Sequence, residues 1–170
     1  MTGRDNIRLY WSLSDDDLSR LYSQAKADGA LDVMAYDLAV SEDLFVLFAR
    51  KAEVFGAVYG SKKDPLGFFY LTGFEGGTAR IHFCLFRAGR ADRLEIGRQV
   101  LAWCFETFEF QCLLGVVPEI NQGAARFAEN CGGLKMGKVP GFCWVDRLKR
   151  AVGGLQFLFT PPVAADQLTH

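Results

Sequence analysis

Three arginines surround a glycine in the short segment 87–93, where Arg87, Arg90 and Arg93 flank Gly89. An alternating, strand-like segment precedes this loop, and a segment of helical period follows it. The end of a strand that leads into a helix N-terminus offers backbone N–H groups and the positive end of the helix dipole, which suit a phosphate group. Guanidinium groups add charge-assisted hydrogen bonds to phosphate. We therefore predict a phosphate site here, with solvated surface arginines as the alternative.

Two side chains near this loop could accept a proton, namely His82 in the preceding strand and Glu119 after a later apolar run that Pro118 closes. An imidazole or a carboxylate can take the proton of an amine, directly or through water. Glu119 is the favoured candidate. The alternatives are a non-catalytic strand histidine and a solvated loop carboxylate. Asn121 is suited to cap the helix that follows it.

Metal chemistry is not expected, because the chain has only two histidines and no closely spaced cysteine pair. The five cysteines are widely spaced and lie in or beside apolar stretches, which is typical of reduced core residues. This cysteine usage favours a reducing, cytoplasmic location. The five are Cys84, Cys104, Cys112, Cys131 and Cys143.

The composition narrows the classes of function. The chain has 170 residues, half of them hydrophobic, and a formal net charge of −1, so we expect one domain over residues 1–170. Charges that nearly cancel provide no broad positive field for nucleic acid. No apolar run approaches the ~20 residues of a membrane span. We therefore expect neither nucleic acid nor a membrane as a partner.

The elements that must position the loop begin with two helices, which Ser14 and Ser41 are predicted to cap before acidic first turns. Three β-rich segments then follow in close succession, which predicts an antiparallel meander. The segments are Val54 to Tyr59, Leu66 to Thr72 and Thr78 to Phe86.

Beyond the arginine loop, apolar residues keep a helical period from Leu94 to Phe108. The apolar run from Cys112 to Val117 then predicts a strand covered on both faces and parallel to the strand before the loop. A helix after Asn121, with Ala124, Phe127, Ala128 and Cys131 on its inner face, and closing strands at Lys138 to Val145 and Leu155 to Thr160 complete the prediction. The fold class is α/β with a mixed (α+β) sheet, in which a meander precedes a β-loop-α-β crossover and closing strands.

This order of elements resembles the GNAT superfamily of acetyl-coenzyme-A-dependent N-acyltransferases. The segment Val117-Pro118-Glu119-Ile120-Asn121, with Ala124, Phe127 and Gly132 after it, is similar to the strand-Asn-x-x-Ala-x-x-apolar segment of that family. Glu95 and the later Phe105-Glu106 resemble the crossover helix of the branch that acetylates the N-termini of ribosomal proteins. The resemblance covers roughly residues 54 to 145.

The resemblance implies that acetyl-coenzyme A is the cosubstrate and that a primary amine, on a small molecule or a protein N-terminus, is the acceptor. It implies Glu119 and His82 as catalytic candidates. The implied cofactor-binding residues are Cys84, Leu85, Phe86, Arg87, Gly89, Arg90, Ala91, Arg93 and Asn121.

The chain departs from the family pattern at several positions. The Gln/Arg-Gly-Gly/Ala signature of the cofactor loop falls on Ala88, Ala91 and Arg93 in one register, or on Asp92, Glu95 and Gly97 in the other. Ala128 stands where many relatives have a Tyr that acts as general acid, and Gly133 stands where they have a Phe. A site poor in acids and bases favours an acceptor amine of low pKa, such as an α-amino group.

Two other interpretations stay open. A GNAT-like domain without turnover could serve as a binding or assembly module, for example of a prophage type. An unrelated α/β domain could use the arginine loop for another phosphorylated ligand. A homodimer is compatible with the sequence.

Overall fold

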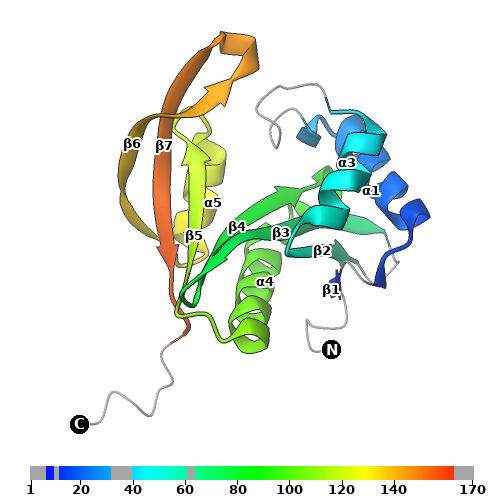
Figure 1. Cartoon of the computed structure of the whole chain (residues 1–170), viewed down its shortest axis with the longest axis horizontal. Helices are drawn as coiled ribbons and strands as arrows, with labels where there is room; N and C mark the ends of the chain where they lie inside the picture. Colours follow the sequence, from blue (N-terminus) through cyan, green and yellow to red (C-terminus); the bar gives the residue numbers. More distant parts are fainter. Residues whose placement is uncertain (1–6, 10–11, 32–39, 61–63, 163–170) are drawn as a thin grey trace.

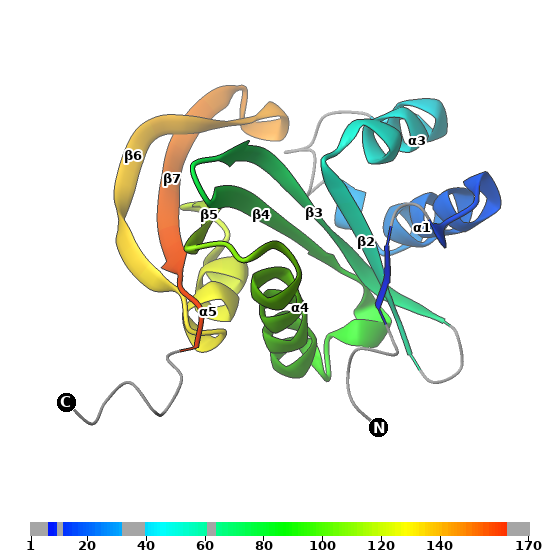
Figure 2. The same cartoon turned by 60° about the horizontal axis from the view of Figure 1, so that its bottom comes forward.

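The computed structural model describes residues 7–9, 12–31, 40–60 and 64–162, which form one mixed seven-stranded sheet with helices on both of its faces (Figures 1 and 2). The strand order is β1-β2-β3-β4-β5-β7-β6. All neighbouring pairs are antiparallel except β4 and β5, which run parallel. The predicted fold class is therefore confirmed.

The two N-terminal helices begin at the predicted caps. Helix α1 (Asp15–Ala27) starts with a capping box in which the Ser14 side chain and Asp17 exchange hydrogen bonds with each other's backbone N–H groups. In α3 (Glu42–Lys51), the Ser41 hydroxyl accepts the N–H of Leu44 at 3.3 Å. Both helices carry acidic first turns and basic last turns, which complement the helix dipole.

The meander contains β2 (Val54–Tyr59), β3 (Pro65–Glu75) and β4 (Thr78–Leu85), close to the predicted bounds. The short strand β1 (Ile7–Leu9) pairs with β2 and was not predicted. After β4, a single 3-10 turn η3 (Arg87–Gly89) leads into α4 (Arg93–Phe108).

The crossover continues through β5 (Cys112–Pro118) and α5 (Gln122–Asn130) to a long hairpin. This hairpin consists of β6 (Leu134–Val145), the turn η4 (Asp146–Leu148) and β7 (Arg150–Phe159). Strand β7 lies between β5 and β6, so the last of the described strands is inserted inside the sheet. Both closing strands begin several residues before their predicted starts.

Two large apolar clusters hold the layers together, one on each face of the sheet. Helices α4 and α5 cover one face, where Val100, Leu113 and Phe157 are fully buried. Helices α1 and α3 cover β2, β3 and β4 on the other face, around the buried Phe45 and Phe68. We call these the α4/α5 face and the α1/α3 face.

Two predictions about burial were wrong. Strand β5 is not covered on both faces: Leu113 is buried, but Leu114 is 37% exposed. Its side chain points to the α1/α3 face, whose helices cover the other half of the sheet (Figure 1). In α5 the buried residues are Ala125 and Ala128, whereas Ala124, predicted to be on the inner face, is only partly buried.

Candidate functional site

A gap opens in the middle of the sheet between β4 and β5 (Figure 1). The two strands pair only from Thr78 with Cys112 to Arg80 with Leu114, yet β4 continues to Leu85 and β5 to Pro118. Beyond Arg80 the strands therefore diverge, and each has an edge without a partner strand. Such an edge presents backbone N–H and C=O groups that a ligand can pair with.

The register shows which backbone groups face the gap. The N–H of Phe86 donates to Leu66 O at 2.9 Å. Backbone direction alternates along a strand, so the N–H and C=O groups of Cys84 and His82 also face β3. The backbones of Phe83 and Leu85 face the gap instead. On β5, the N–H of Glu119 donates to Gly153 O at 2.8 Å, and by the same alternation the backbone of Val116 faces the gap.

The arginine loop is tied closely to its surroundings. Within the loop, the Gly89 N–H donates to Phe86 O at 3.0 Å and the Arg90 N–H to Arg87 O at 3.2 Å. The Arg87 N–H donates to the Asp28 carboxylate at the end of α1. A Cβ at Gly89 would meet Leu66 O at 2.5 Å, so only glycine allows the loop to approach β3 this closely.

The N-terminus of α4 opens beside this loop without a side-chain cap. Ser14, Ser41 and Asn121 cap α1, α3 and α5, but no side chain accepts an N–H group at the start of α4. The first N–H groups of a helix have no partner inside the helix. All three arginines of the loop are exposed here, as are Ala88 and Ala91. The arrangement provides donors and positive charge for an anion.

His82 projects onto the α1/α3 face of β4. Its ring stacks on Tyr70 with the centroids 4.3 Å apart, and Nε2 lies 3.2 Å from Thr72 Oγ1. Burial, together with the charge of Arg80, lowers the pKa of His82 to about 4. The imidazole is therefore neutral at neutral pH, and it can accept a hydrogen bond but holds a proton weakly.

Glu119 links the ends of β5, β6 and β7. Its Oε1 accepts the Gly153 N–H at 2.7 Å, and its Oε2 lies 3.0 Å from Lys138 Nζ. The Gly153 hydrogen bond, followed by that of Lys138 and the nearby charge of Arg150, lowers the pKa of the Glu119 carboxyl. A carboxylate with these partners is ionised and a weak base.

The two catalytic candidates lie on opposite faces of the sheet. His82 has the same side-chain direction as Cys84, which packs in the α1/α3 cluster. A Cβ at Gly153 would touch Glu119 Cδ at 3.0 Å, and Gly153 points to the same face as Leu155 and Phe157 of the α4/α5 cluster. His82 and Glu119 therefore do not face the gap from the same side of the sheet.

Asn121 does cap α5, because its Oδ1 accepts the Ala124 N–H at 3.1 Å. Helix α5 in turn packs closely on α4 through a glycine. A Cβ at Gly97 would meet Cys131 Sγ at 2.6 Å and the Phe127 ring at 2.7 Å. Phe127 also contacts Phe83 of β4, with ring centroids 5.5 Å apart. The helix that begins at Asn121 is therefore held against the α4/α5 side of the gap.

The structure brings together only part of the predicted cofactor set. Leu85 and the exposed part of the arginine loop lie at the end of β4 and the start of α4, whereas Cys84 and the Phe86 N–H are directed to β3. Sequence reasoning missed Phe83 and Val116, whose backbones also line the gap. Strand register would have identified them, but a single sequence does not fix register to one residue.

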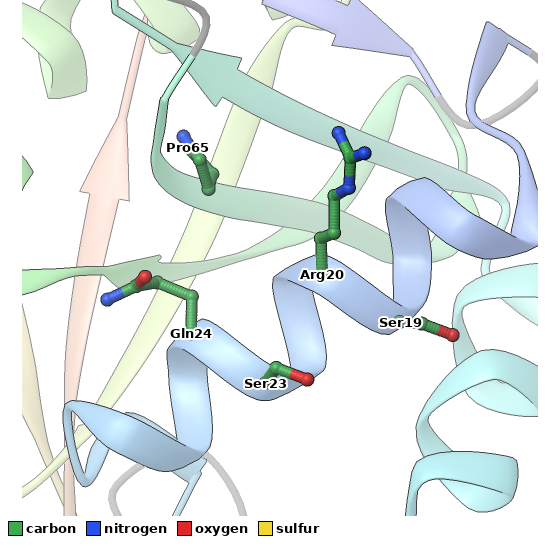
Figure 3. Close-up of a pocket in the computed structure, with 5 residues that line it drawn as sticks. All are labelled: Ser19, Arg20, Ser23, Gln24 and Pro65. Carbon is green, nitrogen blue, oxygen red and sulfur yellow. The ribbon is translucent and has the colours of Figure 1, made fainter.

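A separate open pocket of ≈ 390 Å³ lies between α1 and the start of β3 (Figure 3). Ser19, Arg20, Ser23 and Gln24 of α1 line it together with Pro65 of β3. None of these is a predicted site residue. In the described residues, no group of His, Cys, Asp and Glu side chains is arranged to hold a metal ion. No helix in that part of the chain is long and apolar enough to cross a membrane.

Comparison with known proteins gives a consistent result at the level of fold. No family model and no curated protein matches the sequence. Solved structures do match, among them an acetyltransferase of the GNAT family from Bacillus anthracis, with a TM-score of 0.72, 14% identity and coverage of 91% of this chain and 93% of that chain.

Two further matches are enzymes of stated activity. One is spermidine N-acetyltransferase from Vibrio cholerae in complex with coenzyme A and spermine, with a TM-score of 0.75, 14% identity and coverage of 92% and 96%. The other is ribosomal-protein-S5-alanine acetyltransferase from Vibrio fischeri, with a TM-score of 0.72, 11% identity and coverage of 92% and 93%. At these identities the likeness concerns the fold, and the chain has the fold of the GNAT acetyltransferases.

Proposed function

We propose that the chain, as one domain, is an N-acyltransferase that moves an acetyl group from acetyl-coenzyme A to a primary amine. The gap between β4 and β5 carries this proposal. It offers the unpaired backbone of Phe83, Leu85 and Val116 to an extended amide-containing arm. An uncapped helix N-terminus and three exposed arginines lie at the end of β4, where a diphosphate would be held.

When bound, acetyl-coenzyme A would supply a thioester carbon and a thiolate leaving group. The backbone groups that face the gap would orient the thioester, and Arg87, Arg90, Arg93 and the start of α4 would bind its phosphates. Asn121 would contribute from the α5 side. The acceptor nitrogen bonds to the acyl carbon, the carbon–sulfur bond breaks with its electron pair on sulfur, and the proton released by nitrogen neutralises the thiolate.

The acceptor amine must lose a proton during the transfer. His82 and Glu119 are both weak bases on opposite faces of the sheet, so the one that faces the amine would accept a hydrogen bond from it or its water rather than store a proton. An α-amino group with a pKa near ~8 loses its proton far more easily than a lysine near ~10.4. An α-amino acceptor, as in the N-terminal acetylating branch, is therefore favoured.

A binding module without turnover is the second candidate. It is favoured by the loop itself, since the N–H groups of Phe86, Arg87, Gly89 and Arg90 are already used within the protein. In that case the GNAT fold would be retained for assembly, and the gap would bind no coenzyme A. The two candidates differ in a property that calorimetry measures directly.

The test is a calorimetric titration with acetyl-coenzyme A, followed by a thiol-release assay with a panel of amines. Saturable binding and amine-dependent thiol release are expected. The double variant Arg90→Ala/Arg93→Ala should weaken binding by ~1.5–3 kcal/mol for each charge-assisted bond lost. Arg20→Ala, on α1 across the sheet, is the matched control. Absence of heat at millimolar ligand would exclude the transferase and leave the binding module as the candidate to test.

A further inference from the structure

Arg80 lies at the closed end of the gap. It occupies the last paired position before the strands diverge, opposite Leu114 on one side and Thr72 on the other. Its side chain points to the same face as that of His82, two residues farther along β4. The side chain is exposed, and within the described ranges no carboxylate forms an ion pair with it.

Basic residues outnumber acidic ones in the strands around the gap, where Glu75 at the end of β3 is the one acidic residue of strands β3 to β7. Strands β4, β5, β6 and β7 contain no Asp or Glu. Of the nearby carboxylates, Glu53 directly precedes β2 and accepts the Gly73 N–H at 3.2 Å, and Glu75 ends β3 opposite Thr78. Glu119 lies on the other face beside Lys138. Among the described residues, Arg80 on the α1/α3 side of the gap therefore has no carboxylate in ion-pair contact.

The positive charge of Arg80 has two effects on an amine that enters from the α1/α3 face. It opposes a bound ammonium ion and so favours the neutral, reactive form of the amine, while it repels acceptors that carry further positive charges. It also attracts an anionic group on the acceptor. Residues 80 and 82 are separated by about 7 Å along the strand, so an acceptor with its amine near His82 can place a neighbouring carboxylate near Arg80.

We propose that Arg80 determines acceptor specificity, and that the acceptor is an amine with a carboxylate close to its amino group. This inference rests on the proposed acetyl transfer. The shared chemistry is the amine and carboxylate pair, which occurs in a free α-amino acid and in a peptide whose first side chain is acidic. Polyamines lack it.

The experiment compares four acceptors at saturating acetyl-coenzyme A: alanine, an Asp-first dipeptide amide, alanine amide and spermidine. We expect the two carboxylate-bearing acceptors to give the highest kcat/KM, and the better of them identifies the source. Arg80→Gln should raise KM for that acceptor about tenfold more than it changes KM for alanine amide, which has the amine without the carboxylate. Arg80→Lys should retain part of the effect, and Arg20→Gln is the control.

The outcomes test acceptor specificity and acetyl transfer separately. Acetyl-coenzyme A binding with spermidine as the best acceptor overturns the specificity inference and leaves acetyl transfer standing. An unchanged KM in Arg80→Gln removes Arg80 as the determinant. No binding of acetyl-coenzyme A overturns the proposed function, and the inference fails with it.

Discussion

The position of His82 on a half-buried strand face makes its protonation costly. Because the folded-state pKa of about 4 lies below the ordinary 6.5, the unfolded chain binds the proton more readily. Stability is therefore full above pH 6.5 and decreases as the pH falls through this window to about 4, by on the order of 3 kcal/mol.

Proton NMR can check this prediction, because the chain has only two histidines, His82 and His170. One imidazole should titrate near pH 4, and its signal should disappear in His82→Gln. The same variant should lose much of the acid-dependent decrease in stability measured by urea unfolding. If both histidines titrate near pH 6.5, the result contradicts the burial of His82 against Tyr70.

Glu119 leads to a second prediction, which separates a structural role from a catalytic one. Glu119→Gln should lower stability, because the amide cannot form the ion pair with Lys138. Since the folded-state pKa of Glu119 is lowered, the difference from wild type should be present above the unfolded-state pKa and vanish as the pH falls through the folded-state value.

Urea unfolding of wild type and Glu119→Gln from pH 3 to pH 7 gives this difference. Glu129→Gln, an exposed carboxylate of α5, is the matched control. A lower kcat with unchanged stability would instead assign Glu119 to proton transfer. A lower stability with unchanged kcat would assign it to the junction of β5, β6 and β7.

Among the elements, α4 and α5 depend on a glycine contact for their close packing. Gly97→Ala places a methyl group within 2.6 Å of Cys131 Sγ and 2.7 Å of Phe127, so these side chains or the helices that carry them must shift. We expect a loss of ~1–3 kcal/mol. Gly123→Ala in α5 is the control, because its nearest neighbour would be Asn121 Oδ1 at 3.7 Å and alanine favours helix by up to ~1 kcal/mol. Thermal unfolding should show opposite shifts.

The elements that the sequence predicts well are those with local signals. Ser14, Ser41 and Asn121 cap helices where expected, because capping depends on residues three positions away. Strand β5 was placed correctly but its burial was not, since an apolar run does not reveal what covers it. The first residues of β6 and β7 were not predicted, because bulges interrupt the pairing of these two strands.

The candidate site was harder to predict because its parts are distant in the sequence. The Asp28 contact with the loop spans 59 positions, and the Gly153 contact with Glu119 spans 34. Local patterns located the arginine loop and Asn121, whereas the gap itself depends on where pairing between β4 and β5 stops. That endpoint is a property of the assembled sheet.

At the scale of the whole molecule, the gap divides the sheet into two halves that only three β4–β5 residue pairs join directly. A ligand that pairs with the backbone on both sides of the gap would complete the sheet. Hydrogen exchange should therefore slow at the amides of Phe83, Leu85 and Val116 when acetyl-coenzyme A is added. Amides between β2 and β3, such as those of Gly56 and Phe69, report the general stabilisation by the ligand and serve as the reference.

Slowing at the gap beyond this reference would show that the ligand acts as a missing strand. Equal slowing at both sets of amides would place the ligand elsewhere, for example in the pocket on α1, and would leave the gap without a role in binding. The distinction matters because ligand binding by the backbone of the gap depends on the fold alone, whereas ligand binding by the loop depends on the arginine side chains. A chain whose loop departs from the family pattern could retain the first contribution after losing the second. Combining hydrogen exchange with the arginine variants measures the two contributions separately.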